Sequence, residues 1–177
     1  MFPKRSLILI CFAAVMAFGL APAAQAAGSG YDFTLGLLAG VGGTEETDSY
    51  TGSSLQLLAG MELYPRTYFI VRAGELALEE DRGNLPEGDL RYLTVSTEYR
   101  LPAGFYTSGL FIGLGYYDLQ SDSGFFDESA FGLNLGVTGD IPLGEHVSVL
   151  VEFSGHYADL DSTQILLMGH AGLAFHF

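Results

Sequence analysis

The clearest indication of the fold is the segment ILLMGHAGLAFHF, which runs from Ile165 to Phe177. Its odd-numbered positions carry apolar residues or glycine, whereas its even-numbered positions include His170 and His176. An apolar residue at every second position predicts a β-strand whose two faces meet different surroundings. Phe175 and Phe177 continue the apolar face to the end of the chain.

Seven runs further upstream show the same alternation. In one of them Leu93 and Val95 share a face, and Glu98 lies on the other. One position breaks the pattern, because Glu75 falls on an apolar face, and we expect a β-bulge there. With the terminal stretch the runs predict eight strands of about 9–14 residues, against the roughly 9–11 that cross a membrane. The seven runs cover residues 31–41, 55–64, 69–75, 92–101, 106–117, 131–140 and 147–157.

The connections between the runs alternate in length. Three are short and contain Pro65, Pro102 or Pro142. Residues 42–53, 79–89 and 120–129 form longer polar connections, and a brief one near Ser162 falls on the same side. Short turns at one end and long loops at the other are typical of outer-membrane barrels. The sequence therefore predicts an all-β fold, an eight-stranded antiparallel up-and-down transmembrane β-barrel.

Alternation alone also fits a soluble, lipocalin-like barrel, in which the apolar face points inward. Two features favour the opposite orientation. The polar face is rich in glycine, which suits the narrow interior of a small barrel. Aromatic residues gather near the strand ends, as the interfacial girdles of membrane barrels do. They are Tyr31, Phe33, Tyr64, Tyr99, Tyr106, Phe175 and Phe177 at the turn end, and Tyr92, Tyr116, Tyr117 and Tyr157 at the loop end.

The first 26 residues have the layout of a secretory signal peptide. Lys4 and Arg5 precede an apolar run, and Ala24-Gln25-Ala26 forms an A-x-A cleavage site. We therefore divide the chain into a signal peptide, residues 1–26, and a barrel domain, residues 27–177. Cys11 lies in the leader, so no disulfide stabilises the exported domain.

The charge of the chain is strongly acidic. Its 7 basic and 21 acidic residues give a net charge of −14, and after residue 26 the basic residues are arginines only. Binding to nucleic acid depends on cationic groups that displace phosphate counterions, so this class of function is excluded. We predict no cofactor.

The terminal strand, which ends on Phe175, His176 and Phe177, looks like the assembly signal of bacterial outer-membrane proteins. The eight-strand layout resembles the small outer-membrane β-barrels that include the OmpA membrane domain and OmpX. This resemblance covers essentially the whole mature chain. It implies the bacterial outer membrane as location, insertion by the barrel-assembly machinery, and contact with membrane lipid and lipopolysaccharide.

Charged residues on the polar face predict an interior ion-pair network of Glu62, Arg72, Glu98 and Arg100. With Pro65-Arg66 at the centre of the turn, Glu62 is expected to pair with Ile70 and to lie diagonally to Arg72. An unpaired charge in such an interior is costly, so Arg72 is expected to join Glu62 and Glu98. The network is interpreted as a structural plug, with a gated path for ions as the alternative, because eight strands leave room for side chains alone.

Two further groups of residues suggest hydrolase chemistry. Glu152, Ser154, His156 and His170 form a predicted interior polar cluster, in which Ser154 pairs with His170. A serine nucleophile must face a substrate, so we interpret this cluster as a structural hydrogen-bond network. The sequence His146-Val147-Ser148 is similar to an H-x-S element of outer-membrane lipid A deacylases, but it lies beside a short turn. In that family the active site faces the outer leaflet.

The predicted long loops carry most of the acidic residues, against Arg82 alone. Carboxylates bind hard divalent cations, so the loops are candidates for cation bridges to lipopolysaccharide or for binding a basic partner. The alternative is a solvated rim. We predict a non-enzymatic protein with a structural or surface-interaction role; a narrow channel and a lipid A-modifying enzyme are the rival functions. The acidic residues are Glu45, Glu46, Asp48, Glu79, Glu80, Asp81, Glu87, Asp89, Asp118, Asp122, Asp127, Glu128, Asp159 and Asp161.

Overall fold

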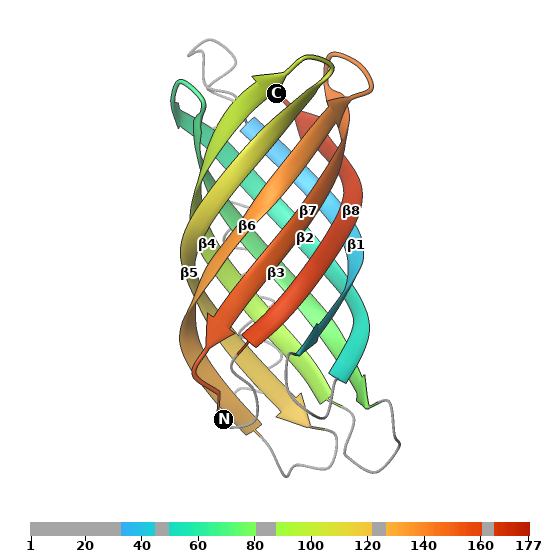
Figure 1. Ribbon diagram of the computed structural model, residues 1–177, viewed down its shortest axis with the longest axis vertical. Helices are drawn as coiled ribbons and strands as arrows, with labels where there is room; N and C mark the ends of the chain where they lie inside the picture. The colour runs from blue at the N-terminus through green and yellow to red at the C-terminus, as the bar shows by residue number, and fades with distance from the viewer. Residues whose placement is uncertain (1–32, 45–49, 81–87, 122–126, 161–164) are drawn as a thin grey trace.

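Eight antiparallel strands form a closed barrel in which each strand pairs with its neighbours in the chain, and β1 pairs with β8 (Figure 1). The computed structural model describes residues 33–44, 50–80, 88–121, 127–160 and 165–177. The fold predicted from the sequence is confirmed. The strands are β1 (Phe33–Thr44), β2 (Tyr50–Tyr64), β3 (Thr67–Glu80), β4 (Gly88–Ala103), β5 (Tyr106–Ser121), β6 (Asp127–Pro142), β7 (Val147–Ala158) and β8 (Ile165–His176).

The strands are staggered around the barrel. A circuit through the paired residues starts at Thr34 in β1 and returns to β1 at Thr44, ten residues further along. A stagger of this kind tilts the strands by about 35–45° and fixes the width of the lumen. The circuit passes through Gly60, Ile70, Ser96, Gly113, Asn134, His156 and Leu166.

Three short turns and both ends of the described barrel lie at the same end, the top in Figure 1. Arg66 has a positive φ of 68° in the β2–β3 turn, and Gly104 has a φ of 72° in the β4–β5 turn. The amide of Phe33 donates a hydrogen bond to the carbonyl of Phe177, which ties the first and last strands together here. We refer to this end as the turn end and to the other as the loop end.

The outer wall of the barrel is apolar. Phe131 is 79% exposed and Ile112 is 66% exposed, and both lie on strands whose alternate residues are buried in the lumen. The face assignment made for a membrane barrel therefore holds, and the inverted, soluble barrel is wrong. Tyr116 and Phe131 pack edge to face on the outer wall near the loop end, with ring centroids 5.4 Å apart.

Two details of the predicted faces need correction. Tyr92 and Tyr117 are buried in the lumen and do not join the outer girdle. No bulge interrupts β3 at Glu75, which pairs in register with Leu55 and Arg91. The Glu75 carboxylate stays on the outer wall and accepts a hydrogen bond from Arg91 Nε at 2.9 Å.

The lumen is filled in layers. An apolar cluster that includes Ile70 and Leu150 lies toward the turn end, and a larger one that includes Leu90 and Leu166 lies toward the loop end. Charged and polar side chains fill the space between these clusters and continue past Tyr68 toward the turn end. Glycines on the inner wall make room for these side chains: a Cβ on Gly136 would lie 2.5 Å from the Phe111 ring. No helix among the described residues is long and apolar enough to cross a membrane.

Candidate functional site

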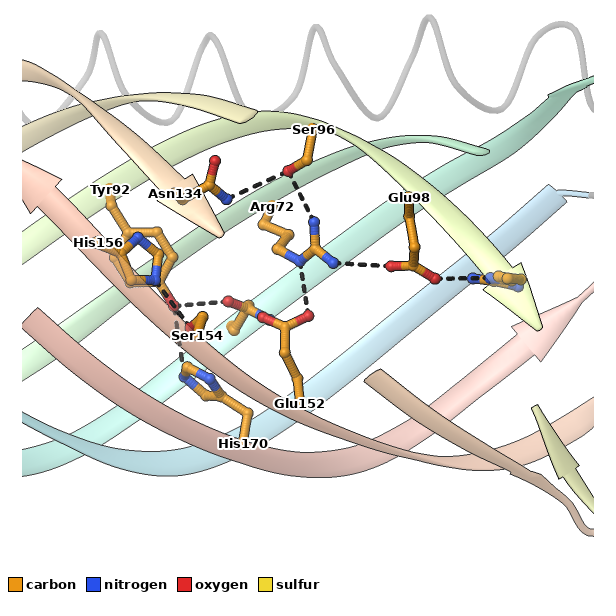
Figure 2. A network of polar contacts seen from close by, with 11 residues as sticks. Arg72, Tyr92, Ser96, Glu98, Asn134, Glu152, Ser154, His156 and His170 are labelled. Carbon is orange, nitrogen blue, oxygen red and sulfur yellow. Dashed lines mark hydrogen bonds and ion pairs between the residues drawn. The ribbon is translucent and has the colours of Figure 1, made fainter. Parts of the chain in front are cut away.

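Arg72 lies at the centre of the polar layer and is fully buried. Its guanidinium donates to three side chains from two other strands: Nε to Glu152 at 2.7 Å, Nη1 to Ser96 at 2.9 Å and Nη2 to Glu98 at 3.1 Å (Figure 2). The same group lies 3.9 Å from the centroid of the Phe111 ring. Charge-assisted bonds of this kind are the strong ones, so they hold the cation rigidly in the lumen.

The charges continue as a chain toward the turn end. The second oxygen of Glu98 accepts a hydrogen bond from Arg100 Nε at 2.7 Å. Arg100 in turn stacks over the Tyr68 ring at 3.9 Å. Two arginines thus alternate with two glutamates, Glu152 and Glu98, and the chain is neutral. We call Glu152, Arg72, Glu98 and Arg100 the charge plug.

Glu62, which the sequence placed in this network, lies elsewhere. Its predicted pairing with Ile70 is wrong, because Glu62 pairs with Tyr68 and Ile70 pairs with Gly60. The β2–β3 turn closes between Tyr64 and Thr67, and an irregularity between Glu62 and Tyr64 shifts the register further. Glu62 Oε1 accepts a hydrogen bond from the amide of Arg66 at 2.7 Å, so it holds the turn and not the plug.

The pairings of β3 with β4 and of β7 with β8 are also displaced by two residues from those predicted. A shift of two residues keeps each side chain on its predicted face. Arg72 pairs with Thr94 where Ser96 was expected, and Glu152 pairs with His170 where Ser154 was expected. The long arginine side chain still reaches Ser96 and Glu98 from its shifted position.

The partnership of Arg72 with Glu152 was missed. Glu152 comes from β7, on the far side of the lumen from β3, and was grouped with nearby histidines. Pairing rules connect neighbouring strands only. Their positions along the strands could have indicated this contact. Both side chains face inward near the middle of their strands, so they lie at the same level of the lumen.

The predicted polar cluster does not form a catalytic triad. His156 Nδ1 lies 2.8 Å from the Tyr117 hydroxyl, and His156 Nε2 lies 2.9 Å from Ser154 Oγ. Glu152 faces Arg72 and leaves neither nitrogen of His156 with a carboxylate partner. Because Ser154 and His156 are buried, no substrate reaches them.

The remaining members of the cluster belong to the same layer. His170 Nε2 lies 2.9 Å from Ser54 Oγ, and the Tyr92 hydroxyl donates to Gln56 Oε1 at 2.9 Å. Gln56 Nε2 donates to Glu152 Oε1 at 3.2 Å, which joins these side chains to the charge plug. Gln56 and Tyr92 thus extend the charge plug toward His170, whereas Tyr117, His156 and Ser154 form a separate hydrogen-bonded group that meets the Tyr92 ring.

Comparison with known proteins agrees with this architecture. The family model of the outer membrane protein β-barrel domain matches residues 10–175. The chain belongs to this family. It is therefore a small β-barrel protein of the bacterial outer membrane, surrounded by membrane lipid. No curated protein matches the sequence.

Solved structures share the fold at low sequence identity. Neisserial surface protein A is 15% identical with a TM-score of 0.64, over 83% of this chain and 97% of that one. OprG from Pseudomonas aeruginosa is 12% identical with a TM-score of 0.62, over 84% and 96%. Ail of Yersinia pestis, solved with the heparin analogue sucrose octasulfate, is 16% identical with a TM-score of 0.55, over 83% and 97%.

Family membership orients the barrel, because outer-membrane barrels have short periplasmic turns and longer extracellular loops. The turn end is thus periplasmic. His146-Val147-Ser148 lies at this end, and its two polar side chains contact the terminal strand separately: Ser148 Oγ lies 2.8 Å from His176 Nε2, and His146 Nδ1 lies 3.1 Å from the His176 carbonyl oxygen. The element does not come together as a catalytic pair.

Ser148, His176 and Asp140 form a second apparent triad whose geometry is wrong for catalysis. The Asp140 carboxylate lies 3.4 Å from His176 Nε2, the same nitrogen that faces Ser148. In a hydrolase the carboxylate binds the other nitrogen and leaves Nε2 free to take the serine proton. Here Nδ1 faces Thr34 Oγ1 at 3.2 Å.

Half of the fourteen acidic residues predicted for the extracellular side fall outside the described residues. The other seven lie in or next to the loop ends of their strands: Glu79, Glu80, Asp89, Asp118, Asp127, Glu128 and Asp159. Among the described residues, no group of three or more His, Cys, Asp or Glu side chains is arranged to hold a metal ion.

Proposed function

We propose that this protein acts through its extracellular rim as a non-enzymatic surface protein, and that its lumen is structural. One observation carries the proposal: the charge plug and the two apolar clusters fill the middle of the lumen. Arg72 and Glu152 are both 0% exposed, and Leu90 and Leu166 are equally buried toward the loop end. A lumen closed in this way offers no passage through the barrel, so contacts with other molecules are made at its two ends.

The chemistry of the rim favours cationic partners. Fourteen acidic residues lie in or next to the predicted loops, with Arg82 as the single basic residue there. We infer that the loops bind divalent cations that bridge to anionic lipopolysaccharide, or a basic partner. Carboxylate oxygens are the ligands such cations prefer.

The cationic partner proposed for this protein is opposite in charge to the ligand named for one structural relative. Ail was solved with the heparin analogue sucrose octasulfate, a polyanion. An acidic rim repels polyanions, so we do not extend that ligand to this chain. Fold similarity at this level of identity carries no ligand with it.

The experiment is a calcium titration of the mature protein, residues 27–177, refolded into vesicles with and without lipopolysaccharide. We expect Ca²⁺ at about millimolar concentration to raise the unfolding midpoint, and more so when lipopolysaccharide is present. The triple variant Glu79→Gln, Glu80→Gln, Asp81→Asn should lose much of the effect. Glu145→Gln, at the periplasmic end, should keep it, and KCl at matched ionic strength should not reproduce it.

The rival functions are separated by two further readouts. A narrow channel requires the charge plug to move, so steady conductance of the wild-type barrel in planar bilayers would contradict a structural lumen. A lipid A-modifying enzyme would change the mass of lipid A in cells that express the protein. The signal peptide and the use of the barrel-assembly machinery remain proposals, which the mature N-terminus and depletion of that machinery would test.

A further inference from the structure

The lumen opens at the periplasmic end into a pocket of 310 Å³. Tyr68, Arg100, Asp140, Ser148 and His176 line it, and they come from five different strands. Its size is at the lower limit of sites that hold small ligands.

The pocket is a dead end. Ile70 and Leu150 lie one inward-facing position deeper than Tyr68 and Ser148, and both are at most 1% exposed. They belong to the apolar cluster that closes this end of the lumen. A ligand could therefore enter from the periplasm and would leave the same way, so the pocket is suited to binding and not to passage.

Arg100 presents hydrogen-bond donors to this pocket. Its side chain is 10% exposed, its Nε is bound to Glu98, and its guanidinium plane rests on the Tyr68 ring. An arginine has five N–H donors in a fixed fork. The two terminal Nη groups make no hydrogen bond to any described residue, so they can bind a planar oxyanion such as a carboxylate.

Asp140 presents the opposite charge in the same pocket. Its side chain is 12% exposed, and its one ion-pair partner among the described residues is His176, at the long distance of 3.4 Å. The carboxylate keeps acceptor capacity for an ammonium group. The pocket is thus lined by a cation with free donors and an anion with free acceptors, which are close enough to interact electrostatically.

We propose that this pocket binds a small zwitterion that carries an ammonium and a carboxylate on one carbon, the head group of an α-amino acid. The carboxylate binds Arg100 and the ammonium binds Asp140. A simple anion would meet the carboxylates of Asp140 and Glu62, and a simple cation would meet Arg100 and Arg66, whereas a zwitterion satisfies both signs. The site lies at the opposite end from the acidic loops and does not depend on the function proposed for them.

The test uses the mature protein refolded in detergent micelles and three probes: L-alanine, acetate and methylammonium. Binding is followed by chemical-shift changes of the His176 ring and by calorimetry. We expect L-alanine to saturate the site at about millimolar concentration and each half-ligand to bind at least about ten-fold more weakly. Acetate binding as well as L-alanine would overturn the zwitterion in favour of a simple anion site. No saturable shift with L-alanine up to about 100 mM would overturn the site itself.

Two variants and a control separate recognition from folding. Asp140→Asn removes the anionic partner, and Arg100→Lys keeps the charge beside Glu98 but removes the fork. Each should weaken L-alanine binding at least about ten-fold, while both remain folded by heat-modifiable mobility on gels. Asp159→Asn, at the loop end, should bind as the wild type does. Unchanged binding in Asp140→Asn would overturn the proposal. These outcomes are independent of the calcium titration, which reports on the loops.

Discussion

Arg72 and Arg91 lie on neighbouring strands, on opposite faces of the same wall, and each binds a glutamate. Arg72 is 0% exposed and donates to Glu98, Glu152 and Ser96. Arg91 is 23% exposed and donates to Glu75, itself 49% exposed. A cation buried in the lumen has lost its water and needs anionic and hydrogen-bonding partners to compensate for that loss. A cation on the outer wall near the loop end can still contact water and lipid headgroups. The location, more than the pair itself, sets how much each ion pair stabilises the barrel.

The largest effect is expected from Arg72→Met, which leaves Glu152 buried without its cation. The free energy of unfolding should fall by about 3–5 kcal/mol. Urea unfolding in lipid vesicles, followed by gel mobility, measures the change. In the double variant Arg72→Met, Glu152→Gln, most of the lost free energy of unfolding should be recovered. No unpaired carboxylate is then left, because Glu98 still pairs with Arg100. A single variant as stable as the wild type would contradict the compensation argument.

Gly136→Ala tests how tightly the inner wall is packed. The new Cβ would overlap the carbonyl oxygen of Phe153 and would lie 2.5 Å from the Phe111 ring, which stacks on Arg72. We expect a loss of about 1–3 kcal/mol from overpacking. Gly155→Ala is the matched control on the outer wall, where the Cβ would lie 3.6 Å from Leu167. The two variants should differ clearly in their urea midpoints.

Thr94→Val tests whether a buried hydroxyl beside the charge plug has a hydrogen-bond partner. Thr94 Oγ1 is buried and has no hydrogen-bond partner among the described residues. Replacing the hydroxyl by a methyl group of similar shape should raise the stability by about 1 kcal/mol. A loss of stability on the same assay would show that the hydroxyl has a partner, such as a buried water.

The smallest effect is expected on the outer wall. Glu75→Gln should lower the stability by about 0.2–1 kcal/mol, in line with exposed ion pairs. A double-mutant cycle with Arg91→Gln isolates the pair. If its coupling energy equals that of Arg72 with Glu152, the contrast between the two arginines fails.

The alternation of residue types predicted the strands, their order and the face of almost every side chain. Tyr92 and Tyr117 were wrongly predicted to lie in the outer girdle, although both stand on the polar face of their runs, which points into the lumen. Registers were wrong by two residues because they depend on turn geometry, such as the positive φ of Arg66, which the sequence does not specify. The contact of Arg72 with Glu152 crosses the lumen, where no pairing rule applies. The pairing of Asp140 with His176 was missed for the same kind of reason, since it depends on the depth of two distant strand ends.

The seam between β1 and β8 joins residues that are 142 positions apart in the chain, such as Thr34 and His176. Closing so long a loop has a large entropic cost, which no local hairpin offsets until the final strand is in place. A chain that stops before β8 would expose two unpaired edges in a solvent that cannot hydrogen-bond them. We therefore expect the barrel to enter the bilayer only after β8 has paired with β1, regardless of the order in which the contacts in the lumen form.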